Sequence, residues 1–133
     1  MDIIPESHLD LLEDVKKAFL YLSTIMPDGT PQVTPVWFNT DRTFILINTA
    51  EGRIKDRNMR AHPEVALCIA DPVNPYRYLQ IRGNVVAFST KGADDHIDAL
   101  AAKYKGVPKY PSRKPGEKRI IYKIKPIKVD AHG

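Results

Sequence analysis

The sequence predicts a mainly β fold of the α+β kind, in which about six antiparallel strands form a small barrel with short flanking helices. Three observations predict it. Several segments are rich in β-branched and aromatic residues, turn residues separate them, and only short stretches repeat apolar residues with helical spacing. With 133 residues, the chain has room for one domain, residues 1–133, around one hydrophobic core.

A short amphipathic helix is expected near the N-terminus, at the rim of the barrel. Ser7 can cap this helix, and Asp10 follows three residues later. Its apolar stripe would consist of Leu9, Leu12 and Val15.

Strands are expected at six places along the chain. Their ranges are 18–26, 31–38, 43–48, 64–71, 76–88 and 119–126, with a short tail after the last one. Asp28-Gly29 predicts a tight hairpin between the first two strands, and Gly83 predicts a bulge that lets the barrel wall curve. Because side chains fill a barrel of this size, a sizeable ligand would bind on the outer wall or between subunits.

Two more helices are expected between the strands. The first covers residues 53–61, follows Gly52 and ends at His62-Pro63. The second covers residues 94–104 and carries two acids in its first turn, where the helix dipole favours them. Its buried face would be formed by Ile97, Leu100, Ala101 and Tyr104.

Composition argues against several classes of function. The net charge of +4 is mild, and the strands lack the basic and aromatic interleaving of a nucleic-acid module. No apolar stretch is long enough to cross a membrane and no secretion signal opens the chain, so we expect a cytoplasmic protein. The only cysteine, Cys68, lies in an apolar run and is expected to be a small buried hydrophobe.

No set of side chains predicts a catalytic residue or a metal site. The histidines have no metal-like spacing and no nucleophile motif occurs; the histidines are His8, His62, His96 and His132. Trp37 alternates with Val33 and Pro35 on one strand face, which favours a core position over a ligand platform.

The helix at residues 53–61 has an unusual order of charges. Arg53 and Lys55 occupy its first turn, where the helix dipole disfavours cations. Two cations beside free backbone N–H groups are suited to a phosphate. Arg57 and Arg60 lie on one face and either extend the positive track or are solvated, and Asn58 can link the backbone to a ligand. The alternative is a solvated surface helix whose charge Glu51 partly offsets. A phosphate site without catalytic side chains suggests that a bound cofactor supplies the chemistry.

Five segments occur in an order that is specific in combination. They read DGTPQVTPVWF, TAEGRIKDRNMRAHPEVAL, NPYRYLQIRGNVV, IDALAAKYKG and RIIYKIKPIKV. Together they resemble the pyridoxamine-phosphate-oxidase-like split β-barrel superfamily, which has the FMN-binding split-barrel fold. Within it, the chain is most similar to the small deazaflavin-dependent oxidoreductases that use coenzyme F420, over about residues 11–129.

The resemblance implies a homodimer with two cofactors in grooves between the subunits. The cofactor phosphate would meet Lys55, with Arg53, Arg57 and Asn58 close by. The ring system would lie beside Gln32, Thr34, Pro35, Val36, Trp37, Asn48 and Thr49, and Gln80 is a weaker candidate. Three further residues would contact substrate from the other subunit: Tyr76, Arg77 and Tyr78.

The implied activity is hydride transfer from reduced F420 to a small, conjugated organic acceptor, without a covalent role for any side chain. FMN is the alternative cofactor, and a non-catalytic storage protein is the alternative function. The basic loop at residues 103–119 either guides an acidic cofactor tail or is solvated. The chain ends at KPIKVDAHG, without the Arg- and His-bearing segment of true pyridoxamine phosphate oxidases, so we expect no oxidation of pyridoxamine phosphate.

Overall fold

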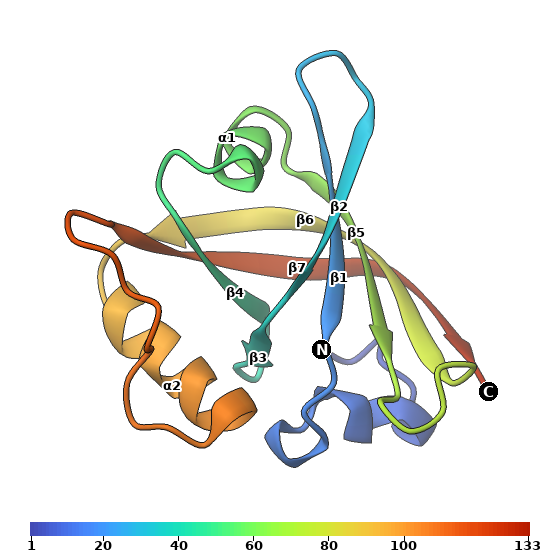
Figure 1. Cartoon of the computed structure of the whole chain (residues 1–133). Coiled ribbons are helices and arrows are strands. Elements are labelled where there is room, and N and C mark those ends of the chain that lie inside the picture. Colours follow the sequence, from blue (N-terminus) through green and yellow to red (C-terminus); the bar gives the residue numbers. More distant parts are fainter.

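A curled antiparallel sheet of seven strands dominates the computed structural model, which describes residues 1–133 (Figure 1). The strands are β1 Leu20–Ile25, β2 Pro31–Val36, β3 Phe38–Thr40, β4 Ile45–Ala50, β5 Glu64–Ala70, β6 Tyr78–Ser89 and β7 Arg119–His132. They pair in the order β2-β1-β5-β6-β7-β4-β3. Two 3-10 segments and two α-helices flank the sheet: η1 Glu6–Leu12, η2 Asp14–Lys16, α1 Ile54–Ala61 and α2 Ala93–Lys105. The mainly β fold expected from the sequence is confirmed.

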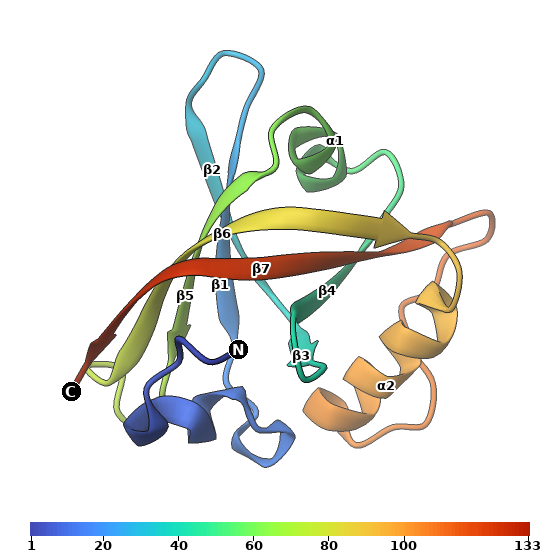
Figure 2. The same ribbon diagram turned by 180° about the vertical axis from the view of Figure 1, so that it is seen from behind.

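The two edge strands of the sheet are neighbours in the sequence. β2 pairs with β1 and β3 pairs with β4, yet Trp37 alone separates β2 from β3. The single strand expected at residues 31–38 is therefore wrong, because the chain passes at Trp37 from one edge of the sheet to the other. This one-residue link brings the edges of the curled sheet together, as in a split barrel (Figure 2).

The last strand is longer than expected. The tail predicted after residue 126 continues β7 and pairs with β6, as far as the pair of Tyr78 with His132. Asp28-Gly29 forms the expected hairpin turn, where Gly29 has a φ of 86° and its N–H donates to the Met26 carbonyl at 2.9 Å. The hairpin that it closes projects beyond the rest of the sheet, beside α1 (Figure 1).

The core lies inside the curl and consists of 19 buried residues, among them Phe38, Leu79 and Tyr122. Gly83 lies where the register of β6 against β7 shifts. A Cβ atom at Gly83 would lie 2.9 Å from both the Ile124 Cγ2 atom and the Lys125 carbonyl oxygen. The predicted bulge is therefore confirmed, because two strands approach there too closely for any other residue.

The N-terminal helix differs from its prediction. It is a 3-10 segment with Pro5 as its N-cap, and no side chain caps it. Its buried residues are His8, Leu11 and Leu12, whereas Leu9 is 41% exposed and Val15, in η2, is 83% exposed. The predicted stripe is only partly right, because Leu12 is buried but the backbone becomes extended at Glu13 and ends η1. Val15 therefore lies in a separate segment and does not continue the buried face. In contrast, α2 buries Ile97, Leu100 and Ala101 as expected.

Cys68 is less buried than its apolar neighbours suggest. Along β5, Val65, Leu67 and Ile69 face the core, so Cys68 falls on the outer face and is only partly covered. That partial burial raises the pKa of its thiol. No helix is long and apolar enough to cross a membrane.

Candidate functional site

A cleft lies outside the core, where the link between β2 and β3 meets the start of α1, the helix α2 and the loop after it. Its volume is about 340 Å³. The lining residues are Phe19, Pro35, Val36, Trp37, Asn48, Arg53, Lys55, Ile97, Lys105, Tyr110, Ser112 and Arg119. They combine a cluster of cations with several aromatic rings.

Three of the cations act on one another: Arg53, Lys55 and Arg119. Lys55 is partly buried, and no carboxylate forms an ion pair with it. Burial lowers the pKa of Lys55, and the charges of Arg53 and Arg119 lower it further. Glu117 pairs with both arginines, at 3.4 Å from Arg53 Nη2 and 2.9 Å from Arg119 Nη1. The two arginines thus share one carboxylate and Lys55 has none, so the excess positive charge attracts an anion.

A second hollow, of about 370 Å³, adjoins the cleft at the start of α1. It is lined by Gln32, Thr34, Gly52, Arg53, Ile54 and Lys55. Arg53 and Lys55 line both spaces, so the N-terminus of α1 lies where the two meet. A ligand larger than the cleft alone therefore has room beside β2.

The order of charges in α1 has a structural explanation. Arg53 is the N-cap and not a first-turn residue, and Asp56 supplies the acid that the helix dipole favours. The buried Asp56 carboxylate accepts hydrogen bonds from the Gly52 N–H, from Arg60 Nε and from the Tyr122 hydroxyl. Burial raises the pKa of Asp56, but these hydrogen bonds outweigh it and the net pKa is lowered. Lys55 is not needed to hold the helix and remains free for a ligand.

Aromatic rings form the other part of the cleft lining. The Trp37 ring stacks on Tyr104 at 5.3 Å and meets the edge of Tyr110 at 6.0 Å. On its other side, Tyr104 stacks on Phe19 at 5.2 Å, and its hydroxyl donates to the Ala18 carbonyl at 2.7 Å. Burial raises the pKa of Tyr104 above its usual value. Trp37 is only partly buried and lines the cleft, so the expected core position is wrong.

A buried polar chain lies behind the cationic part of the cleft. Arg119 Nε donates to Asn48 Oδ1 at 2.8 Å, and Asn48 Nδ2 lies 3.0 Å from His96 Nδ1. His96 Nε2 lies 2.8 Å from Asn39 Oδ1. Burial lowers the pKa of His96 to about 4, with a further contribution from the charge of Arg119. The imidazole is therefore neutral at physiological pH.

The structure brings together most of the predicted cofactor residues. Six line the cleft: Pro35, Val36, Trp37, Asn48, Arg53 and Lys55. Gln32 and Thr34 line the adjoining hollow. These eight residues therefore lie close together in the structure, as residues that share one ligand must.

Four predicted cofactor residues lie elsewhere. Asn58 is buried and donates to Thr24 Oγ1 at 3.0 Å, which ties α1 to β1. Thr49 is 1% exposed and its hydroxyl has no hydrogen-bond partner. Arg57 is exposed and its Nε donates to the Gly52 carbonyl at 2.9 Å. Gln80 lies on the exposed face of β6, so none of the four lines the cleft or the adjoining hollow.

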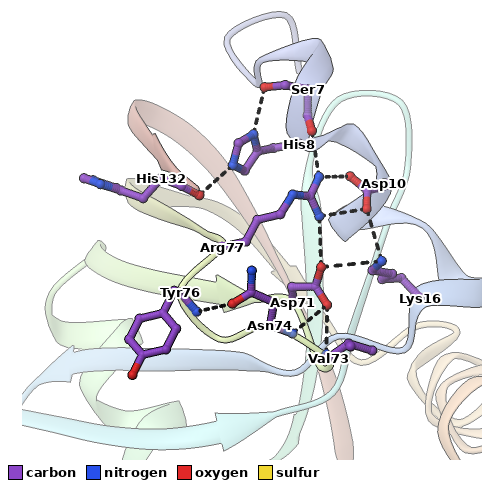
Figure 3. Close-up of polar contacts among 10 residues, drawn as sticks. All are labelled: Ser7, His8, Asp10, Lys16, Asp71, Val73, Asn74, Tyr76, Arg77 and His132. Carbon is purple, nitrogen blue, oxygen red and sulfur yellow. Dashed lines mark hydrogen bonds and ion pairs between the residues drawn. The ribbon is translucent and has the colours of Figure 1, made fainter.

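The predicted substrate residues lie at the start of β6, away from α2 (Figure 1), with Tyr76 and Arg77 in the turn before the strand (Figure 3) and Tyr78 as its first residue. Tyr76 is 84% exposed, and Tyr78 stacks on His132. Arg77 donates to both carboxylate oxygens of Asp10 and to Asp71, and its Nη2 also donates to the Ser7 carbonyl. The Arg77 guanidinium is thus occupied within its own chain, where it ties η1 to the sheet.

Several cleft residues were not predicted as ligand contacts: Phe19, Ile97, Lys105, Tyr110, Ser112 and Arg119. Three of them besides Arg119 lie in the basic segment 103–119 that was predicted as a loop: Lys105 is the last residue of α2, whereas Tyr110 and Ser112 lie in the loop after it. Two other cations of the loop are engaged elsewhere, since Lys109 and Arg113 pair with Asp98. For Arg119, the only signal in the sequence is a cation at the first position of an apolar strand.

Comparison with known proteins decides the family. The family described as pyridoxamine 5′-phosphate oxidase matches residues 4–133. The chain belongs to this family. The family is the one expected from the order of the sequence segments, and that expectation is confirmed.

Solved structures of similar proteins agree with this assignment. A protein named F420 reductase is 32% identical, with a TM-score of 0.83, and the match covers 96% of this chain and 98% of that one. A conserved hypothetical protein from Mycobacterium tuberculosis is 20% identical, with a TM-score of 0.74 and coverage of 98% and 85%. The similarity to the Mycobacterium tuberculosis protein shows a shared fold alone, whereas the similarity to the F420 reductase includes the amino-acid sequence.

Proposed function

We propose that this protein is an oxidoreductase that binds the deazaflavin cofactor F420 in the cleft and reduces a small, conjugated organic acceptor. The observation that carries the proposal is the convergence of Arg53, Lys55 and Arg119 on a cleft that aromatic rings also line. A cofactor that joins a flat ring system to a phosphate matches both parts. Similarity to the F420 reductase favours F420 over FMN.

The residues present fit such a cofactor. Lys55 and Arg53 would hold its phosphate at the N-terminus of α1. Pro35, Val36 and Trp37 would border its ring system and keep water away from it. When bound in its reduced form, the cofactor supplies the hydride. The side chains of this chain contribute binding and orientation, which place donor and acceptor in register.

The phosphate contact is tested by replacing Lys55. Lys55→Ala should weaken cofactor binding by about 1.5 to 3 kcal/mol, the range for a hydrogen bond to a charged group. Binding is measured by titrating the purified protein with F420 and, separately, with FMN, and following absorbance and fluorescence. Lys125→Ala is the matched control, because Lys125 is an exposed cation on β7 outside the cleft. Equal affinities of the two variants would contradict a phosphate site at α1. If the protein bound FMN and not F420, FMN would be the cofactor.

A second experiment separates an enzyme from a storage protein. The protein loaded with reduced cofactor is mixed with quinones, tetrapyrroles and conjugated carbonyl compounds, and reoxidation of the cofactor is followed. We expect at least one acceptor to accelerate reoxidation above the rate for free cofactor. If none does, storage is the better interpretation.

We also propose a homodimer, in which a second copy covers the outer face of the sheet. A groove of about 390 Å³ runs over β1, β5, β6 and β7 on that face, and most of its exposed surface is apolar. Beside it, Val33 is 66% exposed, Ile127 is 48% exposed and Tyr21 is 44% exposed. Apolar side chains gathered on a sheet face favour association. β2 carries Val33 on this face and also borders the cleft, so a second copy would lie next to the cofactor site.

A further inference from the structure

Arg119 is a cation held almost entirely inside the protein. Its side chain is only 3% exposed, although the residue lines the cleft. Nε donates to Asn48 Oδ1 at 2.8 Å and Nη1 donates to Glu117 Oε1 at 2.9 Å. The third nitrogen, Nη2, makes no hydrogen bond within the protein. Since a guanidinium has five N–H donors, one edge of this buried group is available to a ligand.

The position of the guanidinium is set by a chain of buried polar groups. The Ala93 carbonyl accepts from Asn48 Nδ2 at 2.9 Å, so the amide must direct its oxygen toward Arg119. The same Nδ2 lies 3.0 Å from His96 Nδ1, which must therefore be the unprotonated nitrogen of the ring. Nε2 then carries the proton and donates to Asn39 Oδ1 at 2.8 Å. The Asn48 amide and the His96 N–H thus have acceptors, and the arrangement permits a single orientation of Asn48.

Two hollows adjoin Arg119, and their charges differ in sign. One is lined by three carboxylates, Glu51, Asp94 and Glu117, which repel an anion, and by Lys118. The other is the cleft, which holds Lys55 and Arg53 instead, and the charge of Arg119 reaches Lys55 strongly enough to lower its pKa. An anion attracted by Arg119 therefore belongs on the side of Lys55.

We propose that Arg119 binds a phosphoryl oxygen in the cleft, on the side of Lys55, and that His96 acts through Asn48 as the residue that positions it. Lys55 comes from α1 and Arg119 from β7, so the two hold the anion from different elements. A guanidinium fork gives this contact a direction that an ammonium group lacks. The proposal rests on the proposed function only in naming the cofactor as the source of the phosphoryl group.

The test of Arg119 uses inorganic phosphate as the probe. In NMR spectra of the ¹⁵N-labelled protein, adding phosphate should shift the Nε–H resonance of Arg119, which requires no variant. Arg119→Gln should weaken phosphate binding about ten- to hundredfold, and Arg119→Lys should lie between it and the unmodified protein. Lys125→Gln, which removes an exposed charge from the same strand, should have no effect. Unchanged phosphate affinity in Arg119→Gln, or an unshifted Arg119 resonance, would overturn the proposal.

The positioning role of His96 is tested by two substitutions. His96→Ala removes the acceptor for Asn48, so the Arg119 Nε–H resonance should broaden and phosphate binding should weaken. His96→Asn places an amide oxygen near the former Nδ1 atom and should restore both. Unchanged phosphate binding and an unchanged Arg119 resonance in His96→Ala would overturn the positioning role, and so would a stably folded His96→Asn that restored neither measurement.

Titrations with F420 and FMN separate this proposal from the proposed function. Phosphate binding at Arg119 without binding of either cofactor would leave the anion site standing and remove the proposed function. Tight binding of F420 by Arg119→Gln would leave the proposed function standing and remove the anion site at Arg119.

Discussion

The polar residues around the cleft differ in how far the fold uses their hydrogen-bonding capacity. Two of them form hydrogen bonds within the chain: Asp56 with Tyr122 of β7, and Asn58 with Thr24 of β1. Lys55 and one edge of Arg119 have no partner in the protein. Affinity for an anion is therefore expected from these unpaired groups and not from every polar residue of α1.

His96 should make stability depend on pH. Its pKa is about 4 in the folded protein against 6.5 for an ordinary histidine, so the unfolded chain binds a proton first as the pH falls. The contribution of neutral His96 is fully present above about pH 6.5 and is lost between about pH 6.5 and 4, by about 3 kcal/mol. Urea unfolding at several pH values measures it.

His96→Asn is the control for that experiment, because it cannot titrate. Acid also protonates carboxylates such as Asp56, but this loss is common to both proteins. The difference in unfolding free energy between the two proteins should therefore shift in favour of His96→Asn as the pH falls through the window. A constant difference would show that His96 is not buried in its neutral form.

At the scale of elements, α1 is fastened to the sheet through its first turn. The Tyr122 hydroxyl of β7 donates to the Asp56 carboxylate, and Asn58 reaches β1 one turn later. The helix has only eight residues, too few to be stable alone. Its N-terminus is thus presented to the cleft by tertiary contacts rather than by helix propensity.

Tyr122→Phe should therefore destabilise the protein without leaving a cavity. The change removes one hydrogen bond to a buried carboxylate, and we expect a loss of about 1.5 to 3 kcal/mol in the free energy of unfolding. Tyr76→Phe is the matched control, because Tyr76 is 84% exposed. Urea denaturation of both variants measures the effect, and equal stabilities would show that Asp56 does not depend on Tyr122.

At the scale of the whole molecule, the proposed dimer predicts a change of mass. Val33→Glu would place a charge in the apolar interface and should convert a dimer into a monomer in analytical ultracentrifugation. Val15→Glu changes a residue that is 83% exposed in η2, at another part of the surface, and should remain dimeric. If the unmodified protein sediments as a monomer, the proposed dimer is wrong.

The sequence predicted the elements better than the way in which they meet. Alternation of apolar residues located the strands, and the turn at Asp28-Gly29 and the bulge at Gly83 followed from local backbone chemistry. The break at Trp37 was missed because it depends on pairing with β1 on one side and β4 on the other. Lys55 was found from the order of charges within one helix.

Arg119 escaped prediction for a physical reason. Its partner Asn48 lies 71 positions away in the chain, and neither residue belongs to a local motif. The same separation explains why Asn58 was taken for a ligand contact, since its partner Thr24 is 34 positions distant. Sequence patterns describe residues that are close together along the chain. Whether a polar side chain serves the fold or remains available to a ligand depends on hydrogen-bond partners that are far away in the sequence.

The link at Trp37 gives the protein an internal optical reporter. Trp37 is the only tryptophan, joins the two edges of the sheet and lines the cleft. Its emission therefore senses both the closure of the barrel during folding and the arrival of a ligand beside the indole ring. A flat, absorbing cofactor would quench the same signal that records refolding, so one fluorophore follows both events without a label.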